Sequence, residues 1–214
     1  MSDNTLKDAF IYDGIRTPFG RHAGALAPVR PDDLLAHTIK SVVERNSFPK
    51  QAYEDVIAGN TNQAGEDCRN VARFASLLAG MPTEVGGLTV NRLCASGLAA
   101  TLHAANSVKI GEGDLFVAGG VESMSRAPLV LSKAQDAYDR GQSLADSTLG
   151  SRFTNPAFAS GYGNDTMPQT ADNIAADVDI SRADSDSFAA ASQAKYEAAR
   201  ADGFFQEEIV ETEV

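Results

Sequence analysis

Several residue types that mark particular classes of protein are scarce in this chain of 214 residues. It contains no tryptophan, three histidines and only two cysteines, Cys68 and Cys94. Two cysteines cannot form a disulfide framework. So low a cysteine content fits a reducing compartment, and we therefore expect a cytoplasmic protein. The histidines and cysteines form no cluster at the spacing of metal ligands, and the sequence therefore predicts no metal site.

Long apolar runs and targeting signals are also missing. No stretch approaches about 18 uninterrupted apolar residues, the length expected of a membrane-spanning helix. The chain starts with polar and acidic residues, without the basic and apolar regions of a secretory signal. The sequence therefore predicts no membrane association.

Positive charge is in short supply. The chain has 18 Lys and Arg against 29 Asp and Glu, a net charge of −11. Residues 165–214 hold 12 acidic and three basic residues, which leaves only −2 for the first 164. This balance argues against nucleic acid as a partner. Any anionic ligand must bind away from the acidic stretch or through backbone N–H groups.

Strand-like and helix-like patterns alternate along the first 120 residues. Short apolar runs predict strands, and apolar residues repeating at the helical period predict helices. The predicted strands are residues 10–13, 55–59, 88–91 and 115–120; the predicted helices are residues 32–43, 70–79 and 95–109. Such alternation is typical of right-handed βαβ units around a mostly parallel sheet, which is an α/β fold.

Three of these elements carry further expectations. Asp32 stands where it can cap the first helix. The helix at 95–109 is rich in alanine and apolar on most sides, so we expect close packing from several directions. The run at 115–120 is nearly continuously apolar, as in a strand covered on both faces.

The pattern changes after Gly120. Residues 123–165 have little periodicity, and so long an irregular segment is usually functional or interactive. Order returns with helix-like residues 170–178 and 181–201, the latter capped by Ser181 with Asp184 in a variant of the capping box. Residues 208–214 alternate between polar and apolar like a strand, but no turn or partner follows them. Such a strand would leave an exposed edge, which we interpret as a sign that the chain is a fragment.

Cys94 stands where a strand-like run changes abruptly into small residues and then an apolar helix. The run from Val90 reads Val-Asn-Arg-Leu-Cys-Ala-Ser-Gly-Leu. This order places the thiol at a strand end and the first turn of a helix, where free N–H groups and the helix dipole favour the nucleophilic thiolate. A lone cysteine is ordinarily buried and inert. The surrounding residues favour the reactive alternative.

Four segments together resemble the thiolase family. Residues 91–98 are similar to the motif around the family's acylated cysteine, and residues 118–125, Ala-Gly-Gly-Val-Glu-Ser-Met-Ser, to its second signature. Residues 14–20 and 203–210 fit the family as well. The resemblance spans essentially the whole chain, in the family's order.

The resemblance implies a thiolase-like α/β fold, layered α-β-α, with a mostly parallel sheet and an inserted loop domain. The complete fold has five layers built from two similar halves, and this chain resembles about half of it. Residues 1–121 then form the N-terminal core and residues 122–214 part of the loop domain, with the chain truncated before the C-terminal half.

The resemblance also implies a chemistry for Cys94. In the family, the cysteine attacks a 3-oxoacyl-CoA, acetyl-CoA leaves, and the shortened acyl group stays on sulfur until a second coenzyme A removes it. A thiol suits this role because it is nucleophilic at neutral pH and forms a reactive thioester. The backbone N–H of Cys94 is a candidate donor to the oxyanion. Coenzyme A is a substrate here, and no cofactor is expected.

The family's general base and second acid/base, a histidine and another cysteine, lie with an asparagine in the second half. None is assigned in this chain. His22, His37 and His103 each have a structural interpretation, and Cys68 lacks the family's Cys-x-Gly context. We therefore predict that residues 1–214 alone do not turn over substrate.

Other matches to the family are weaker. Met167 corresponds to a methionine that lines the coenzyme A channel, with core packing as the alternative interpretation. Its neighbour Thr166 replaces a residue that is often histidine in biosynthetic thiolases. Residues 123–140 resemble the region through which thiolase subunits associate, which implies a homodimer or homotetramer.

The subfamily resemblance is to 3-oxoadipyl-CoA thiolases of aromatic-compound degradation. It rests on residues 62–67, 69–73, 125–128 and 152–156. A substrate that ends in a free carboxylate needs a cation near the acyl pocket. The candidates are Arg69, Arg73, Arg126 and Arg152, with ordinary surface pairing as the alternative for each.

Three other functions are weighed against this one. An acetoacetyl-CoA or fatty-acid 3-ketoacyl-CoA thiolase differs only in acyl-pocket residues. A ketoacyl synthase shares the fold but lacks the form of residues 119–125 seen here. A non-catalytic assembly module with a vestigial cysteine conflicts with the intact turn at 93–97.

Overall fold

The computed structural model describes residues 6–214 and divides them into two compact units. The first unit holds the residues up to Ala127 together with Glu208–Val214, and the second holds Pro128–Glu207. The division thus falls a few residues after the predicted boundary at 121. Residues 208–214, which we had grouped with the loop domain, belong to the first unit.

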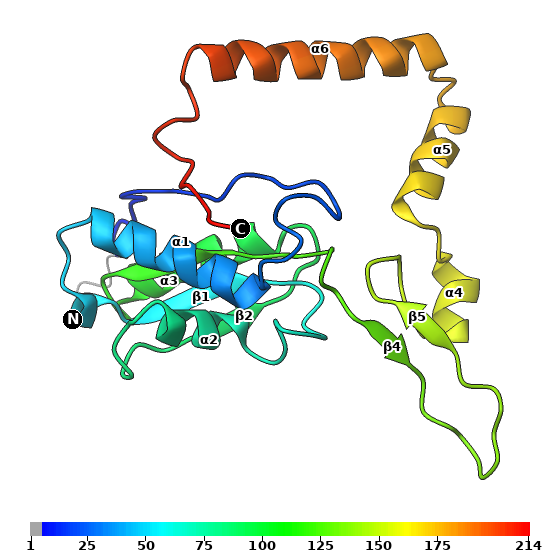
Figure 1. Ribbon diagram of the computed structural model, residues 1–214, viewed down its shortest axis with the longest axis horizontal. Coiled ribbons are helices and arrows are strands. Elements are labelled where there is room, and N and C mark those ends of the chain that lie inside the picture. The colour runs from blue at the N-terminus through cyan, green and yellow to red at the C-terminus, as the bar shows by residue number, and fades with distance from the viewer. Residues whose placement is uncertain (1–5) are drawn as a thin grey trace. The chain divides into compact units, whose positions relative to one another are not determined.

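A parallel sheet forms the centre of the first unit (Figure 1). Strand β1 (Asp55–Gly59) lies between β2 (Leu88–Val90) and β3 (Phe116–Gly120), and both neighbours run parallel to it. Only crossover connections join parallel neighbours, and here α2 and α3 provide them. The predicted α/β fold with a parallel sheet is confirmed.

Helices cover both faces of this sheet. Helices α1 (Pro31–Arg45) and α2 (Val71–Leu78) lie on one face, and α3 (Ser96–Ile110) lies on the other. Strand β1 is buried toward both layers because its side chains alternate: Val56 and Ala58 pack with α1 and α2, whereas Ile57 packs with Ala100 of α3. A single 3₁₀ turn, Lys50–Ala52, precedes β1.

Helix α1 begins differently from the prediction. Pro31 occupies its first turn and Arg30 the cap position, without a side-chain cap. Asp32 is buried inside the first turn and ion-paired with Arg30 at 2.8 Å, so its predicted role as the cap is wrong. Proline favours this start because its fixed φ suits the first helical turn and its missing N–H has no partner there.

Two packing expectations are also wrong for this chain. Helix α3 buries a single stripe of small residues, including Ala100 and Ala104, while Leu98 and Leu102 stay exposed. Strand β3 is only partly buried, because β1 is its one neighbour in the sheet. An apolar pattern records which surfaces favour burial, and these two surfaces have no cover within the described residues.

The predicted strand at residues 10–13 does not form. Phe10 and Ile11 are 86% and 85% exposed, and nothing in the described chain pairs with them as a strand. Pairing is limited to one parallel bridge between Arg16 and Ile209, where the N–H of Arg16 donates to the carbonyl of Glu208 at 2.7 Å. The strand-like residues 208–214 likewise form this bridge alone.

The second unit is built from local elements. Strands β4 (Leu129–Leu131) and β5 (Leu144–Asp146) form an antiparallel hairpin that the sequence pattern did not predict, and α4 (Pro156–Tyr162) was missed as well. Helices α5 (Met167–Asp177) and α6 (Arg182–Ala201) confirm the two predicted helices. Ser181 caps α6 by accepting from the N–H of Asp184 at 3.1 Å. No residue of α4, α5 or α6 is buried.

None of the helices within residues 6–214 has both the length and the apolar character needed to cross a bilayer.

Candidate active site

The carboxyl ends of the three parallel strands bring three loops to one edge of the sheet. These loops are residues 60–70 after β1, residues 91–95 after β2 and residues 121–128 after β3. Open α/β sheets bind ligands outside this edge. The predicted nucleophile, Cys94, belongs to the middle of the second loop.

Cys94 lies in a tight turn between β2 and α3. The turn ends at Ala95, and α3 begins at Ser96. Cys94 is exposed, so it is not a thiol enclosed in hydrocarbon. The sequence placed it at a strand end beside a helix start, and the structure places it there.

The turn depends on an unusual backbone at Leu93, which has a φ of +50°. The left-handed conformation costs a non-glycine residue about 1–2 kcal/mol. Two side chains hold it: Asn91 accepts from the N–H of Leu93 at 2.9 Å, and the Ser96 hydroxyl donates to its carbonyl at 2.6 Å. The Ser96 hydroxyl also accepts from the N–H of Arg92 at 2.8 Å. Sequence reasoning treated Asn91 and Ser96 only as parts of a motif.

Gly59 at the end of β1 lets α3 approach the sheet closely. A Cβ at this position would lie 2.4 Å from the backbone carbon of Ser96 and 2.5 Å from the nitrogen of Gly97. The first turn of α3 therefore rests directly on the strand backbone. This contact fixes the height of the Cys94 turn above the sheet.

Polar side chains tie the loop after β1 to the loop after β3. Asn60 is fully buried and donates to the carbonyl of Val121 at 2.8 Å. Glu66 forms a two-pronged ion pair with Arg126, and Arg30 approaches the same carboxylate at 3.3 Å. The hydrogen bonds from Arg126 hold the pKa of Glu66 below its ordinary value.

These contacts narrow the set of cations available for a substrate carboxylate. The guanidinium of Arg126 is committed to Glu66. That of Arg73 donates to the carbonyls of Val85 and Thr83, which closes the loop before β2. Arg69 is exposed in the loop after β1, and Arg152 lies in the second unit. Arg69 and Arg152 remain as candidates.

The histidines and the second cysteine lie on the elements that the sequence predicted for them: His22 in a turn, His37 on α1, His103 on α3 and Cys68 in the loop after β1. The Nε2 of His37 is 2.7 Å from the carbonyl oxygen of Glu211. His22 and His103 are exposed, and so is Cys68, whose backbone N–H donates to Gly65. Among residues 6–214, no three ligating side chains gather as a metal site.

Met167 lies in the second unit, as the first residue of α5. It is 70% exposed, and the side chain of Gln169 accepts from the N–H of its neighbour Thr166 at 2.8 Å. Cys94 and Met167 belong to different units. The role of Met167 in a coenzyme A channel stays a prediction.

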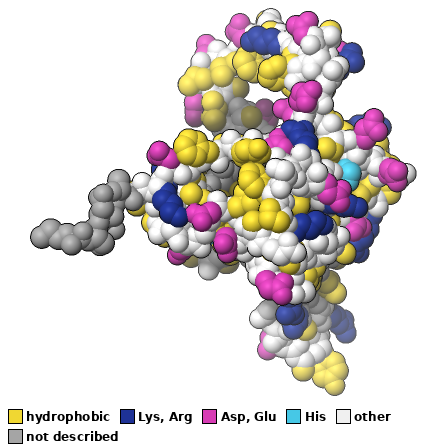
Figure 2. Space-filling view, turned by 90° about the vertical axis from the view of Figure 1, so that its left-hand side faces the viewer, with side chains coloured by type: hydrophobic (Ala, Val, Ile, Leu, Met, Phe, Trp, Pro, Cys, Tyr) yellow, Lys and Arg dark blue, Asp and Glu magenta, His cyan; other side chains and the backbone are white. Residues whose placement is uncertain are grey.

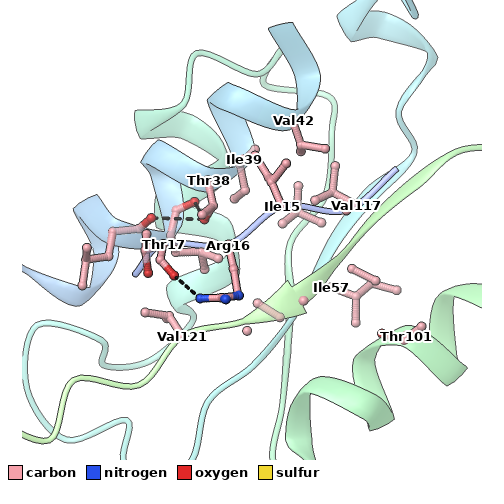
Figure 3. Close-up of a pocket in the computed structure, with 18 of the residues that line it drawn as sticks. Ile15, Arg16, Thr17, Thr38, Ile39, Val42, Ile57, Thr101, Val117 and Val121 are labelled. Atoms are coloured by element: carbon pink, nitrogen blue, oxygen red, sulfur yellow. Dashed lines mark hydrogen bonds between the residues drawn. The ribbon is translucent and has the colours of Figure 1, made fainter. Parts of the chain in front are cut away.

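A cavity of about 930 Å³ opens in the first unit and reaches residues 121–125 of the loop after β3. Figure 3 shows Ile15, Arg16 and Thr17 beside α1, with Ile57 and Thr101 on another side of the pocket. Hydrophobic side chains also reach the surface in Figure 2. Cys94 does not line this cavity, which lies instead along the unpaired edge of β3. The cavity is therefore not the candidate active site.

Comparison with known proteins gives a consistent set of matches. The family described as "Thiolase, N-terminal domain" matches residues 9–214. A "3-oxoadipyl-CoA/3-oxo-5,6-dehydrosuberyl-CoA thiolase" of Escherichia coli K12 is 53% identical over 96% of this chain and 51% of its own length. A "Beta-ketoadipyl-CoA thiolase" of Pseudomonas putida is 54% identical over 96% of this chain and 52% of its length.

A solved structure agrees with these matches. The crystal structure of an acetyl-CoA acetyltransferase of Bacillus anthracis matches with a TM-score of 0.87 and 29% identity, over 99% of this chain and 53% of that one. The chain thus spans about half the length of the curated relatives it matches.

Proposed function

We propose that Cys94 is the nucleophile of an acyl-CoA C-acyltransferase. This chain belongs to the thiolase family and matches its N-terminal domain. The observation that carries the proposal is the exposed thiol in the turn between β2 and α3. A buried or helix-interior cysteine could not reach a carbonyl carbon. This one has a free approach at the ligand-binding edge of a parallel sheet.

The reaction proceeds by two acyl transfers. The sulfur of Cys94 attacks the 3-oxo carbonyl of a 3-oxoacyl-CoA, and a C–S bond forms. The bond between Cα and Cβ then breaks, and its electron pair stays on Cα as the enolate of acetyl-CoA, which takes up a proton. The thiol of a second coenzyme A attacks the thioester and releases Cys94, so the cycle needs no cofactor. The family resemblance places the proton-transfer groups in the second half of the fold, outside residues 1–214.

The proposed substrate is 3-oxoadipyl-CoA. Support comes from relatives at 53–54% identity, whose names specify 3-oxoadipyl-CoA or beta-ketoadipyl-CoA. The second carboxylate of this substrate requires a cation. Of the four candidate arginines, Arg73 and Arg126 already have partners among the described residues, which leaves Arg69 and Arg152. An acetoacetyl-CoA thiolase is the second candidate, favoured by the likeness to the acetyl-CoA acetyltransferase.

Thiolysis by the full-length protein tests both levels of the proposal. We expect Cys94→Ser to abolish thiolysis, while Cys68→Ser, the other exposed cysteine, retains it. We expect 3-oxoadipyl-CoA to be cleaved with a higher kcat/KM than acetoacetyl-CoA. Full activity of Cys94→Ser would refute the assignment of Cys94 as the nucleophile. A preference for acetoacetyl-CoA would refute only the assignment of 3-oxoadipyl-CoA as the substrate.

Replacing each remaining arginine by methionine tests the carboxylate contact. Loss of one buried or half-buried charged hydrogen bond costs about 1.5–3 kcal/mol, or roughly 10- to 100-fold. We expect Arg69→Met or Arg152→Met to lower kcat/KM for 3-oxoadipyl-CoA by this factor and to spare acetoacetyl-CoA. Arg182→Met is the control, because its exposed guanidinium pairs with Asp186 within α6. Equal losses on both substrates remove that arginine from the role.

A further inference from the structure

We propose that Asn91 and Glu122 are positioning residues for Cys94, acting through Thr61 as one hydrogen-bonded chain across the three strand ends. This inference rests on the proposed function, because it assigns these side chains a task in presenting the nucleophile. Among residues 6–214, the side chains of Asn91 and Glu122 form no hydrogen bond with Cys94. Their effect passes through the backbone of the turn.

The chain starts at the end of β3. One carboxylate oxygen of Glu122 accepts two bonds from Thr61: from its backbone N–H at 2.8 Å and from its hydroxyl at 2.5 Å. Thr61 directly follows Asn60 at the end of β1. A charged acceptor with two donors on one residue fixes both the backbone and the side chain of that residue.

Asn91, at the end of β2, carries the chain to the turn. Its amide nitrogen donates to the carbonyl of Thr61 at 3.0 Å, and its amide oxygen accepts from the N–H of Leu93 at 2.9 Å. The two partners, a carbonyl and an N–H, determine the orientation of this amide. A side chain with one donor and one acceptor at this length is required, and aspartate lacks the donor.

The end of this chain is the strained residue. Leu93 has a φ of +50°, and Cys94 is the next residue. Relaxation of Leu93 to an ordinary backbone would rotate the following peptide and redirect the thiol. Ser96 holds the other side of the same turn through the carbonyl of Leu93. Asn91 and Ser96 therefore clamp Leu93 from its N–H and its C=O.

The solvent exposure of these side chains distinguishes a positioning role from a contribution to stability. Asn91 and Glu122 are exposed, and Thr61 is half-buried. Hydrogen bonds at such places contribute little net stability, since water replaces a lost partner. A misplacement of about 1 Å at a reacting group can nonetheless cost about 100-fold in rate. Substitutions in this chain should therefore change the chemistry of Cys94 more than the melting temperature.

The experiment uses the full-length protein with Asn91→Asp, Thr61→Val, Thr61→Ser and Glu122→Gln. We expect Asn91→Asp to lower kcat for thiolysis by about 10- to 100-fold, with KM and Tm nearly unchanged. Thr61→Val should lose activity, and Thr61→Ser, which keeps the hydroxyl, should restore it. Thr38→Val is the matched control, because within residues 6–214 that half-buried hydroxyl donates to the carbonyls of Leu34 and Leu35 in its own helix.

A second readout does not require thiolase activity. Alkylation of Cys94 by iodoacetamide is followed by peptide mass spectrometry, with exposed Cys68 as the internal reference. Asn91→Asp should change the Cys94/Cys68 rate ratio several-fold, whereas Thr38→Val should leave it unchanged. Wild-type ratio and wild-type kcat in Asn91→Asp and Thr61→Val overturn the inference. If Asn91→Asp changes the ratio but the wild-type protein cleaves no 3-oxoacyl-CoA, the inference is supported and the proposed function is refuted.

Discussion

At the scale of single residues, short polar side chains at the sheet edge determine the backbone conformation around Cys94. Asn91 and Ser96 hold the one left-handed residue that precedes Cys94. The cysteine and its turn were predictable, because the change from strand-like to small residues is visible in the sequence. The hydrogen bonds of Arg73 and Arg126 were not predictable, since their partners lie 10 to 99 residues away in the sequence.

Asp55, at the opposite end of β1, provides a test of electrostatics at the residue scale. Burial raises the pKa of its carboxyl group, and the hydrogen bond with Val56 opposes this only in part. One of its oxygens is buried without a partner in the described chain. The folded state therefore binds a proton more tightly than the unfolded state does, and stability falls as pH rises through the folded pKa.

We therefore expect Asp55→Asn to stabilise the protein by about 1 kcal/mol at pH 7, the scale of an unpaired buried polar group. The gain should shrink as pH approaches about 4, where the unfolded carboxyl also takes up its proton. Urea unfolding at several pH values measures it. Asp8→Asn, at an exposed aspartate, is the control. A pH-independent gain would contradict this explanation.

At the scale of elements, the contact between β1 and α3 sets the position of the site. We expect Gly59→Ala to destabilise the protein by about 2 kcal/mol, because the new methyl group would overlap the backbone of Ser96 and Gly97. Gly119→Ala in β3 is the matched control, since nothing lies within 4 Å of its added Cβ. Equal unfolding free energies for the two variants would show that α3 does not rest on Gly59.

The prediction of elements succeeded where the pattern is local and failed where it depends on a neighbour. Periodicity identified α2, and periodicity with the Ser181 cap identified α6, each within a residue or two. Residues 10–13 read as a strand from composition alone, yet a strand exists only with a partner, and none lies among residues 6–214. The hairpin of β4 and β5 was missed because only the middle residue of each strand is half-buried and its neighbours are exposed, so no buried run marks these strands.

At the scale of the whole molecule, the proposed nucleophile Cys94 has no histidine beside it in the loops that residues 6–214 form at the sheet edge. His37 is bonded to the carbonyl of Glu211, and His22 and His103 are exposed outside the three loops at the sheet edge. The curated relatives are about twice as long as this chain. The cavity along β3 and the exposed face of α3 are further surfaces without cover in residues 6–214.

We therefore expect the 214-residue chain, by itself, to cleave no acetoacetyl-CoA or 3-oxoadipyl-CoA, whereas the full-length protein does. Nucleophilic attack without a positioned acid or base loses about 10²- to 10⁴-fold for each missing group. A coupled assay that follows the loss of 3-oxoacyl-CoA absorbance compares the two at equal molar concentration. Turnover by the isolated chain would place the proton-transfer groups within residues 1–214.

The most direct test of the central claim is the mass of the Cys94 peptide after the full-length protein is exposed to acetyl-CoA. If Cys94 is the acylated nucleophile, we expect one acetyl group on Cys94, none on Cys68, and removal of the adduct by added coenzyme A. An unmodified Cys94, or an adduct on Cys68 alone, would contradict the assignment of Cys94 as the acylated nucleophile.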